Sequence, residues 1–150
     1  MKTCKFIAAM VAVLLPLAIV SCGTKEEPEK TPEPIGEFTG SFSIVNSDGS
    51  TFSMEDIRAG YEVGEGVVDI TLYGVSFSPR MPMTLDMTIP GVAVSKAPDG
   101  YSLSSASITP VALGKPFPNY MVTDLSGSLT DDLLTLKMDI GGCPSTYSGR

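Results

Sequence analysis

Four aspartates come nearest to a catalytic apparatus in this sequence: Asp69, Asp86, Asp124 and Asp139. Two carboxylates on neighbouring strands can hydrolyse a glycosidic bond, one as the acid and the other as a base or nucleophile. Each of the four lies in or near an alternating, strand-like segment, where such residues usually face solvent. The sequence has no histidine, which removes the commonest general base, the Ser-His arrangement and imidazole metal ligands. We therefore expect no enzymatic activity, no catalytic residues, no cofactor and no metal site.

Two proline-rich segments carry the residues best suited to binding. "FSPRMPM" (residues 77–83) and "GKPFPNYM" (residues 114–121) each combine aromatic and methionine side chains with one cation. Methionine provides an adaptable apolar surface, and the mouth of a barrel is a common ligand site. If both segments lie at the same end of a barrel, they form either an apolar rim around a pocket or a plug that completes the core. The candidate ligand-binding residues are Phe77, Arg80, Met81, Met83, Lys115, Phe117 and Tyr120.

Cys22 follows the apolar segment at the start of the chain. Lys2 and Lys5 precede the apolar segment "FIAAMVAVLLPLAIV" (residues 6–20). This segment is shorter than the ~20 residues of a membrane-spanning helix and fits the apolar part of a secretory signal. The next two residues, "SC", resemble the bacterial lipobox, in which a small residue precedes a cysteine that becomes the acylated N terminus. The resemblance implies a signal peptide over residues 1–21 and lipidation of Cys22. The alternatives are an ordinary signal peptide with an incidental cysteine and a retained membrane anchor.

Residues 22–36 follow as a tether rich in proline and glutamate. Such a composition buries too little surface to offset the entropy of ordering it, so we expect this segment to be disordered. "KEE" (residues 25–27) also resembles the acidic export signal of surface lipoproteins in the Bacteroidetes. These features predict a protein of the bacterial cell envelope that is attached to the outer membrane through an N-terminal lipid anchor. Display on the cell surface is a further hypothesis.

Charge and cysteine content limit the partners. The chain has ten lysines and arginines against seventeen aspartates and glutamates, a formal net charge of −7. Because binding to nucleic acid depends on neutralising phosphates, we expect no nucleic-acid partner. If Cys4 leaves with the signal and Cys22 is acylated, Cys143 has no partner within the mature chain. We expect Cys143 to be a buried free thiol, and an intermolecular disulfide is the alternative.

The elements that must position these residues are strands. "MTLDMTI" (residues 83–89) and "LLTLKMDI" (residues 133–140) alternate apolar and polar side chains, which is typical of half-buried strands. In two other segments the alternation slips, near Gly74 and near Ser105, as β-bulges would cause. The absence of sustained helical spacing predicts one all-β domain over residues 37–150, either an antiparallel barrel or a β-sandwich. The predicted strands are 38–45, 51–57, 67–77, 83–89, 101–108, 120–129 and 133–140.

One stretch adds a family resemblance to this pattern. "VDITLYGVSFSPRMPMTLDMTIPGVAV" (residues 68–94), together with "GEFTGSF" (residues 36–42) and "SLTDDLLTLKMDI" (residues 128–140), resembles the calycin-like β-barrel domain of Bacteroidetes lipoproteins. The resemblance implies a lipocalin-like antiparallel meander closed into a barrel, with no catalytic residues. Residues 145–149 would then form the last strand and pair with the first. Because the chain stops at Arg150, we expect that strand to be short and the closure to be imperfect.

These observations favour a non-enzymatic binding lipoprotein. Its barrel would hold a small apolar ligand or bind another envelope protein. A structural or accessory subunit of an outer-membrane surface complex is the alternative. The chain contains no tryptophan, and it therefore lacks the largest aromatic platform for stacking on a sugar.

Overall fold

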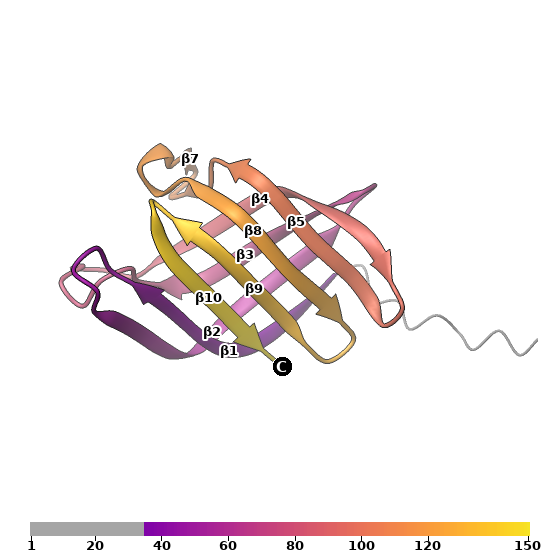
Figure 1. The fold of residues 1–150 in the computed structure, drawn as a ribbon, viewed down its shortest axis with the longest axis horizontal. Helices are drawn as coiled ribbons and strands as arrows, with labels where there is room; N and C mark the ends of the chain where they lie inside the picture. The colour runs from indigo at the N-terminus through magenta and orange to yellow at the C-terminus, as the bar shows by residue number, and fades with distance from the viewer. Residues whose placement is uncertain (1–34) are drawn as a thin grey trace, which may run out of the picture.

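Strands that alternate between apolar and polar side chains make up most of residues 35–150, the part of the chain that the computed structural model describes (Figure 1). Two short strands and a single 3-10 turn lie between β5 and β8. The main strands are β1 (Ile35–Val45), β2 (Thr51–Val63), β3 (Val67–Val75), β4 (Leu85–Ala97), β5 (Gly100–Ile108), β8 (Val122–Thr130), β9 (Leu134–Ile140) and β10 (Cys143–Gly149). The inserted elements are β6 (Val111–Ala112), β7 (Lys115–Pro116) and η1 (Pro118–Tyr120).

The main strands form a closed antiparallel barrel of eight strands. Each strand pairs with its neighbour along the chain, β5 pairs directly with β8 across the insertion, and β10 pairs with β1. The predicted all-β, lipocalin-like meander is therefore confirmed. The alternative of a β-sandwich is wrong, because the sheet closes on itself and leaves no edge between β1 and β10.

The contact between β1 and β10 completes this closure. The two strands stay in register from Gly40 opposite Gly149 to Ile44 opposite Ser145. Beyond them, Thr39 and Arg150 exchange both backbone hydrogen bonds at 3.0 Å. The prediction that residues 145–149 pair with the first strand is therefore confirmed. The prediction of an imperfect closure is wrong, because this pairing is continuous and closes the barrel. The strand itself begins earlier than predicted, at Cys143, and pairs with β9 over its whole length.

Gly40 permits the close approach of these two strands. A Cβ atom added to Gly40 would lie only 1.9 Å from the backbone oxygen of Ser148. Glycine is required there by lack of space, because the neighbouring backbone cannot move away without breaking the ladder.

The inward faces of the strands fill the barrel. On β9, Leu134, Leu136, Met138 and Ile140 are all buried, as the alternation predicts. A barrel of eight strands has an interior just wide enough to be filled by side chains or to hold one small ligand. Here the inward side chains form one apolar cluster. Its largest fully buried members are Tyr147, Phe42, Ile70, Leu72, Met87, Ile89, Leu103, Leu129, Leu134, Met138, Ile140 and Val68.

Bulges explain most differences between the predicted and observed strands. The bulge predicted near Gly74 is confirmed by the register shift between Leu72 and Val75. The bulge predicted near Ser105 is wrong, because β5 stays in register with β8 there. The irregularity lies instead on β8, between Thr123 and Ser126, where β8 pairs with β9. Another register shift, beside Asp56 at a φ of 56°, lets β2 continue to Val63 instead of ending at Ile57.

Other boundaries also move. Strand β3 ends at Val75, and β4 begins at Leu85 and continues to Ala97. Ile35 and Gly36 belong to β1, although their composition suggested the end of the tether. The predicted signal peptide, Cys22 and the tether up to residue 34 lie outside the described residues.

The barrel has two different ends. Ile35 and Arg150 lie at the end that we call the terminal end, together with the turns at residues 64–66, 98–99 and 131–133. The opposite end, which we call the loop end, carries the connections at residues 46–50, 76–84, 109–121 and 141–142. In Figure 1 the C terminus and strand β7 mark these opposite ends. Both candidate binding segments are therefore at the loop end.

Candidate binding surface at the loop end

The two proline-rich segments meet through stacked aromatic rings. The ring of Phe77, in the β3–β4 connection, stacks on that of Tyr120 with centroids 4.7 Å apart. Tyr120 in turn stacks on Phe117 at 5.2 Å. On the inner side, Phe77 meets Phe42 of β1 edge-on at 6.2 Å. Four rings thus form a continuous row from the barrel interior to the outside of the loop end.

Burial divides the seven candidate residues into two groups. Phe77 is 5% exposed, and Met81, Phe117 and Tyr120 are half-buried and pack against the core. These four side chains cover the end of the barrel, which is the arrangement of a plug rather than of an open rim. The three that project into solvent are Arg80, Met83 and Lys115.

Backbone hydrogen bonds hold both segments in place. In the first, the Met81 N–H donates to the carbonyl of Ser78 at 3.0 Å. In the second, the Phe117 N–H donates to the carbonyl of Pro110 at 2.8 Å. The Gly141 N–H, in the β9–β10 turn, donates to the carbonyl of Met121 at 2.9 Å and so ties the second segment to the barrel. The covering of the loop end is therefore a fixed part of the fold.

A small hollow lies beside the aromatic row. Its volume is about 210 Å³, and Cys143 borders it from the start of β10. Cys143 is a free thiol and is half-buried, so it is less enclosed than expected from the sequence. The other lining residues are Ile44, Asn46, Phe77, Ser78, Asn119, Tyr120, Ile140 and Gly141.

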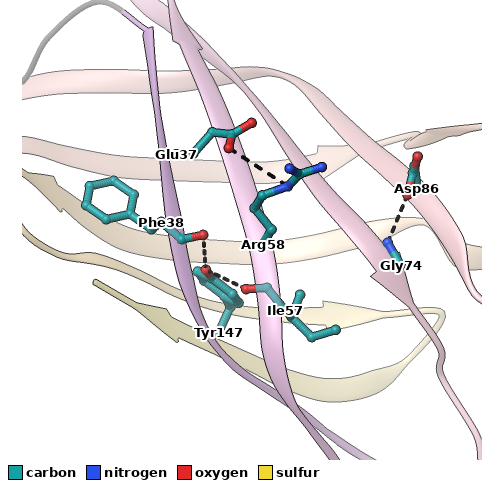
Figure 2. A network of polar contacts seen from close by, with 7 residues as sticks. All are labelled: Glu37, Phe38, Ile57, Arg58, Gly74, Asp86 and Tyr147. Carbon is teal, nitrogen blue, oxygen red and sulfur yellow. Dashed lines mark hydrogen bonds and ion pairs between the residues drawn. The ribbon is translucent and has the colours of Figure 1, made fainter.

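Two of the four aspartates have structural roles in the barrel wall. Asp86 Oδ1 accepts a hydrogen bond from the Gly74 N–H at 2.8 Å (Figure 2), and Asp69 Oδ1 accepts one from the Gly91 N–H at 2.7 Å. Both glycines have a φ of 67° and lie at register shifts between β3 and β4. Each carboxylate therefore holds a bulge on the opposite strand. Within residues 35–150, no group of three or more His, Cys, Asp or Glu side chains is placed to hold a metal ion.

Charge differs between the two ends. Every turn at the terminal end carries at least one exposed carboxylate, and these are Glu65, Asp99, Asp131 and Asp132. The connections at the loop end carry the cations Arg80 and Lys115 and the carboxylate Asp48, and Asp86 lies exposed at the start of β4. The Ser50 hydroxyl and then its backbone N–H donate to Asp48 and lower the pKa of that carboxyl. Asp48 thus stabilises the β1–β2 turn, and the loop end is the less acidic end of the barrel.

Sequence reasoning missed two features of the outer surface. On β2, the Arg58 guanidinium lies 4.6 Å from the centroid of the Tyr73 ring. Its Nε lies 3.8 Å from Oε2 of Glu37 (Figure 2). At the tip of the β6–β7 hairpin, Leu113 is 68% exposed. No local pattern marks the first cluster, because its residues come from three strands. The second was detectable as the "LG" pair (residues 113–114) of a tight turn.

Comparisons with protein-family models, with curated proteins and with solved structures found no match for this chain. The interpretation of the loop end therefore rests on its own chemistry. Among residues 35–150, none of the helical structure is long and apolar enough to span a membrane.

Proposed function

We propose that this chain is a lipid-anchored lipoprotein of the bacterial outer membrane and that its barrel is a non-enzymatic binding domain. The observation that carries the proposal is the opposite placement of the two ends. Ile35, which follows the segment with the lipobox-like cysteine, is at the terminal end, and both candidate binding segments are at the loop end. An anchor on Cys22 would therefore leave the loop end facing away from the bilayer.

Electrostatics support this orientation. The turns of the terminal end carry four exposed carboxylates, and anionic lipid headgroups repel carboxylates within about a Debye length, ~10 Å at 0.1 M salt. These carboxylates outnumber the exposed cations at this end, Lys96 and Arg150, so the terminal end would not adhere to an anionic membrane surface. The loop end, with Arg80 and Lys115, would be free to meet a partner.

The packing of the loop end favours an envelope protein over a small apolar ligand. Ligand pockets usually enclose about 300–1,000 Å³, whereas the hollow beside Phe77 and Tyr120 has a volume of about 210 Å³. A larger hollow of about 490 Å³ lies beside the β6–β7 hairpin, but Asp86, Thr84 and Thr88 among its lining residues make it a poor site for an apolar ligand. Phe77 itself is buried under Tyr120. A partner would therefore contact the outer side of the loop end, where Met83 is 58% exposed and Arg80 and Lys115 reach solvent.

The anchor is tested in cells by feeding an alkyne analogue of palmitate to bacteria that make the full chain. The wild-type chain should carry the label and sediment with membranes, and Cys22→Ala should do neither. Cys143→Ala is the matched control and should keep both properties. An unlabelled wild-type chain would overturn the lipid anchor.

The binding surface is tested with a photo-crosslinking amino acid at Met83, in the same cells. The matched control places the crosslinker at Ile35, which is 66% exposed but at the terminal end. We expect discrete protein adducts from Met83, their loss when Arg80→Glu and Lys115→Glu are added, and no such adducts from Ile35. Equal adducts from both positions would contradict a binding surface at the loop end.

A further inference from the structure

Leu113 occupies a backbone conformation that suits it poorly. Ala112 pairs with Lys115, so Leu113 and Gly114 form the two-residue loop of the β6–β7 hairpin. Their φ angles are 53° and 72°, as a type I′ turn requires, and Asn, Asp or Gly is the usual first residue of that turn. A leucine there is unfavourable because its Cβ crowds the following carbonyl oxygen. Gly114 fits the turn, and Leu113 does not.

The side chain of Leu113 gains little within its own chain. It is 68% exposed, more than any other large apolar side chain in the described part of the chain, and it is not among the side chains that pack against the core. A strained and exposed apolar residue is a cost to the isolated barrel. Such strain at a surface position points to a function outside the monomer.

A hollow lies directly beside the exposed side chain of Leu113, which we call the knob. It has a volume of about 490 Å³ and lies between the hairpin and the start of β4. The hairpin pairs with β4 at only two positions, Met87 with Ala112 and Thr88 with Val111, and the start of β4 is left open alongside it. Its lining residues are Thr84, Leu85, Asp86, Thr88, Val111, Leu113 and Gly114.

The knob and the hollow carry groups of opposite charge. Lys115 stands two residues from Leu113, and Asp86 lines the hollow. Asp86 uses Oδ1 to hold Gly74, so its second oxygen can accept from a cation. A two-fold interface needs one surface that carries both halves of each contact. Leu113 of one copy, placed in the hollow of another, would bring Lys115 close to Asp86 of the other copy, and the same pair would form again across the axis.

We propose that the β6–β7 hairpin and the hollow beside it are the contact surface for a second copy of this chain. The surface is limited to a hairpin tip and one hollow, whereas stable protein interfaces bury about 1,200–2,000 Å² in total. The association is therefore weak in solution and increases with concentration. Confinement on a membrane would raise the effective concentration, but the contact does not depend on the anchor. It shares Lys115 with the binding surface proposed above, whereas Leu113 belongs to the dimer contact alone.

Disulfide trapping tests the contact in the full chain. Two differently tagged copies are made in the same cells, one with Leu113→Cys and the other with Thr84→Cys, and are oxidised and separated on nonreducing gels. We expect a reducible dimer that carries both tags. In the matched control Ile35→Cys replaces Leu113→Cys, because Ile35 is about as exposed, at 66%. In further controls each single-cysteine variant is made together with the wild-type chain, which measures the dimer that forms through the native cysteines. A dimer no stronger than in these controls would overturn the proposal.

Leu113→Asn distinguishes a contact residue from a structural one. Asparagine suits the first position of a type I′ turn, so the thermal midpoint of the variant should rise. Chemical crosslinking of the full chain should at the same time lose its dimer. A lower midpoint would show that Leu113 stabilises the hairpin itself, and an unchanged dimer would show that the knob is not part of the contact. Either result would overturn the proposal.

Discussion

Tyr147, on the last strand of the barrel, donates a hydrogen bond from its hydroxyl to the backbone carbonyl of Phe38 on the first strand, at 3.2 Å (Figure 2). The same hydroxyl reaches the carbonyl of Ile57 on β2, at 3.1 Å. Tyr147 is only 1% exposed, so water cannot replace either contact. One side chain therefore joins β10, β1 and β2 beside the bulge near Asp56.

Tyr147→Phe should lower the free energy of unfolding by about 1–3 kcal/mol, because it removes a buried donor from the backbone carbonyls of Phe38 and Ile57. The ring and its packing remain, so the fold should persist. Urea unfolding followed by circular dichroism measures the change. Tyr101→Phe is the matched control, since Tyr101 is half-buried and its hydroxyl makes no hydrogen bond within residues 35–150. An equal loss in both variants would contradict the role of the Tyr147 hydroxyl.

The same hydroxyl makes the barrel sensitive to alkali. Burial raises the pKa of Tyr147 to about 12, whereas the tyrosine of an unfolded chain titrates near 10. Because the folded value is the higher one, the contribution to stability is intact below about pH 10 and is lost as the pH rises toward about 12. The loss from this residue should approach roughly 2–3 kcal/mol. Urea midpoints measured across that range should fall less steeply for Tyr147→Phe than for the wild type, and parallel slopes would contradict the assignment.

The bulges between β3 and β4 give a third prediction. Asp86→Ala should destabilise the barrel by about 1–2 kcal/mol, because the Gly74 N–H loses a charged acceptor. Asp86→Asn keeps an acceptor oxygen and should recover part of the loss. Glu65→Ala, an exposed carboxylate in a turn of the terminal end, should change little. The thermal midpoints of the three variants are compared with that of the wild type. An Asp86→Ala variant as stable as the wild type would show that the bulge forms without this carboxylate.

The alternation of side chains predicted much of this barrel. In segments such as 133–140 the alternation predicts both the strand and its buried face, because a half-buried strand alternates apolar and polar side chains. The extension of β2 to Val63 was not predictable in this way, since the register shift beside Asp56 reverses the pattern. The final strand was predicted only through the family resemblance, and its side chains alone give little sign of it. Most of "CPSTYSG" (residues 143–149) is polar or small, and its place is set by backbone pairing with β1 and by Tyr147 rather than by a run of apolar residues.

The candidate site was also predictable only in part. Composition indicated residues 77–83 and 114–121 as the two candidate binding segments, and they do meet at one end of the barrel. Which side chains would be buried depended on Phe42, a residue of β1 that is distant in sequence. The structural roles of Asp69 and Asp86 depended on glycines of the opposite strand. Contacts of this kind arise only when the barrel closes.

The aromatic row at the loop end gives the last prediction. Phe77→Ala should lower the free energy of unfolding by about 3–5 kcal/mol, the usual cost of a buried phenylalanine and the cavity it leaves. The half-buried Phe117→Ala should cost clearly less, since part of its ring already faces solvent. Removing Phe77 also opens the barrel end under Tyr120, so the variant should take up an apolar dye such as anilinonaphthalene sulfonate while the wild-type barrel does not. Equal stability losses for the two variants, or dye uptake by the folded wild-type chain, would show that the loop end is an open pocket rather than a packed plug.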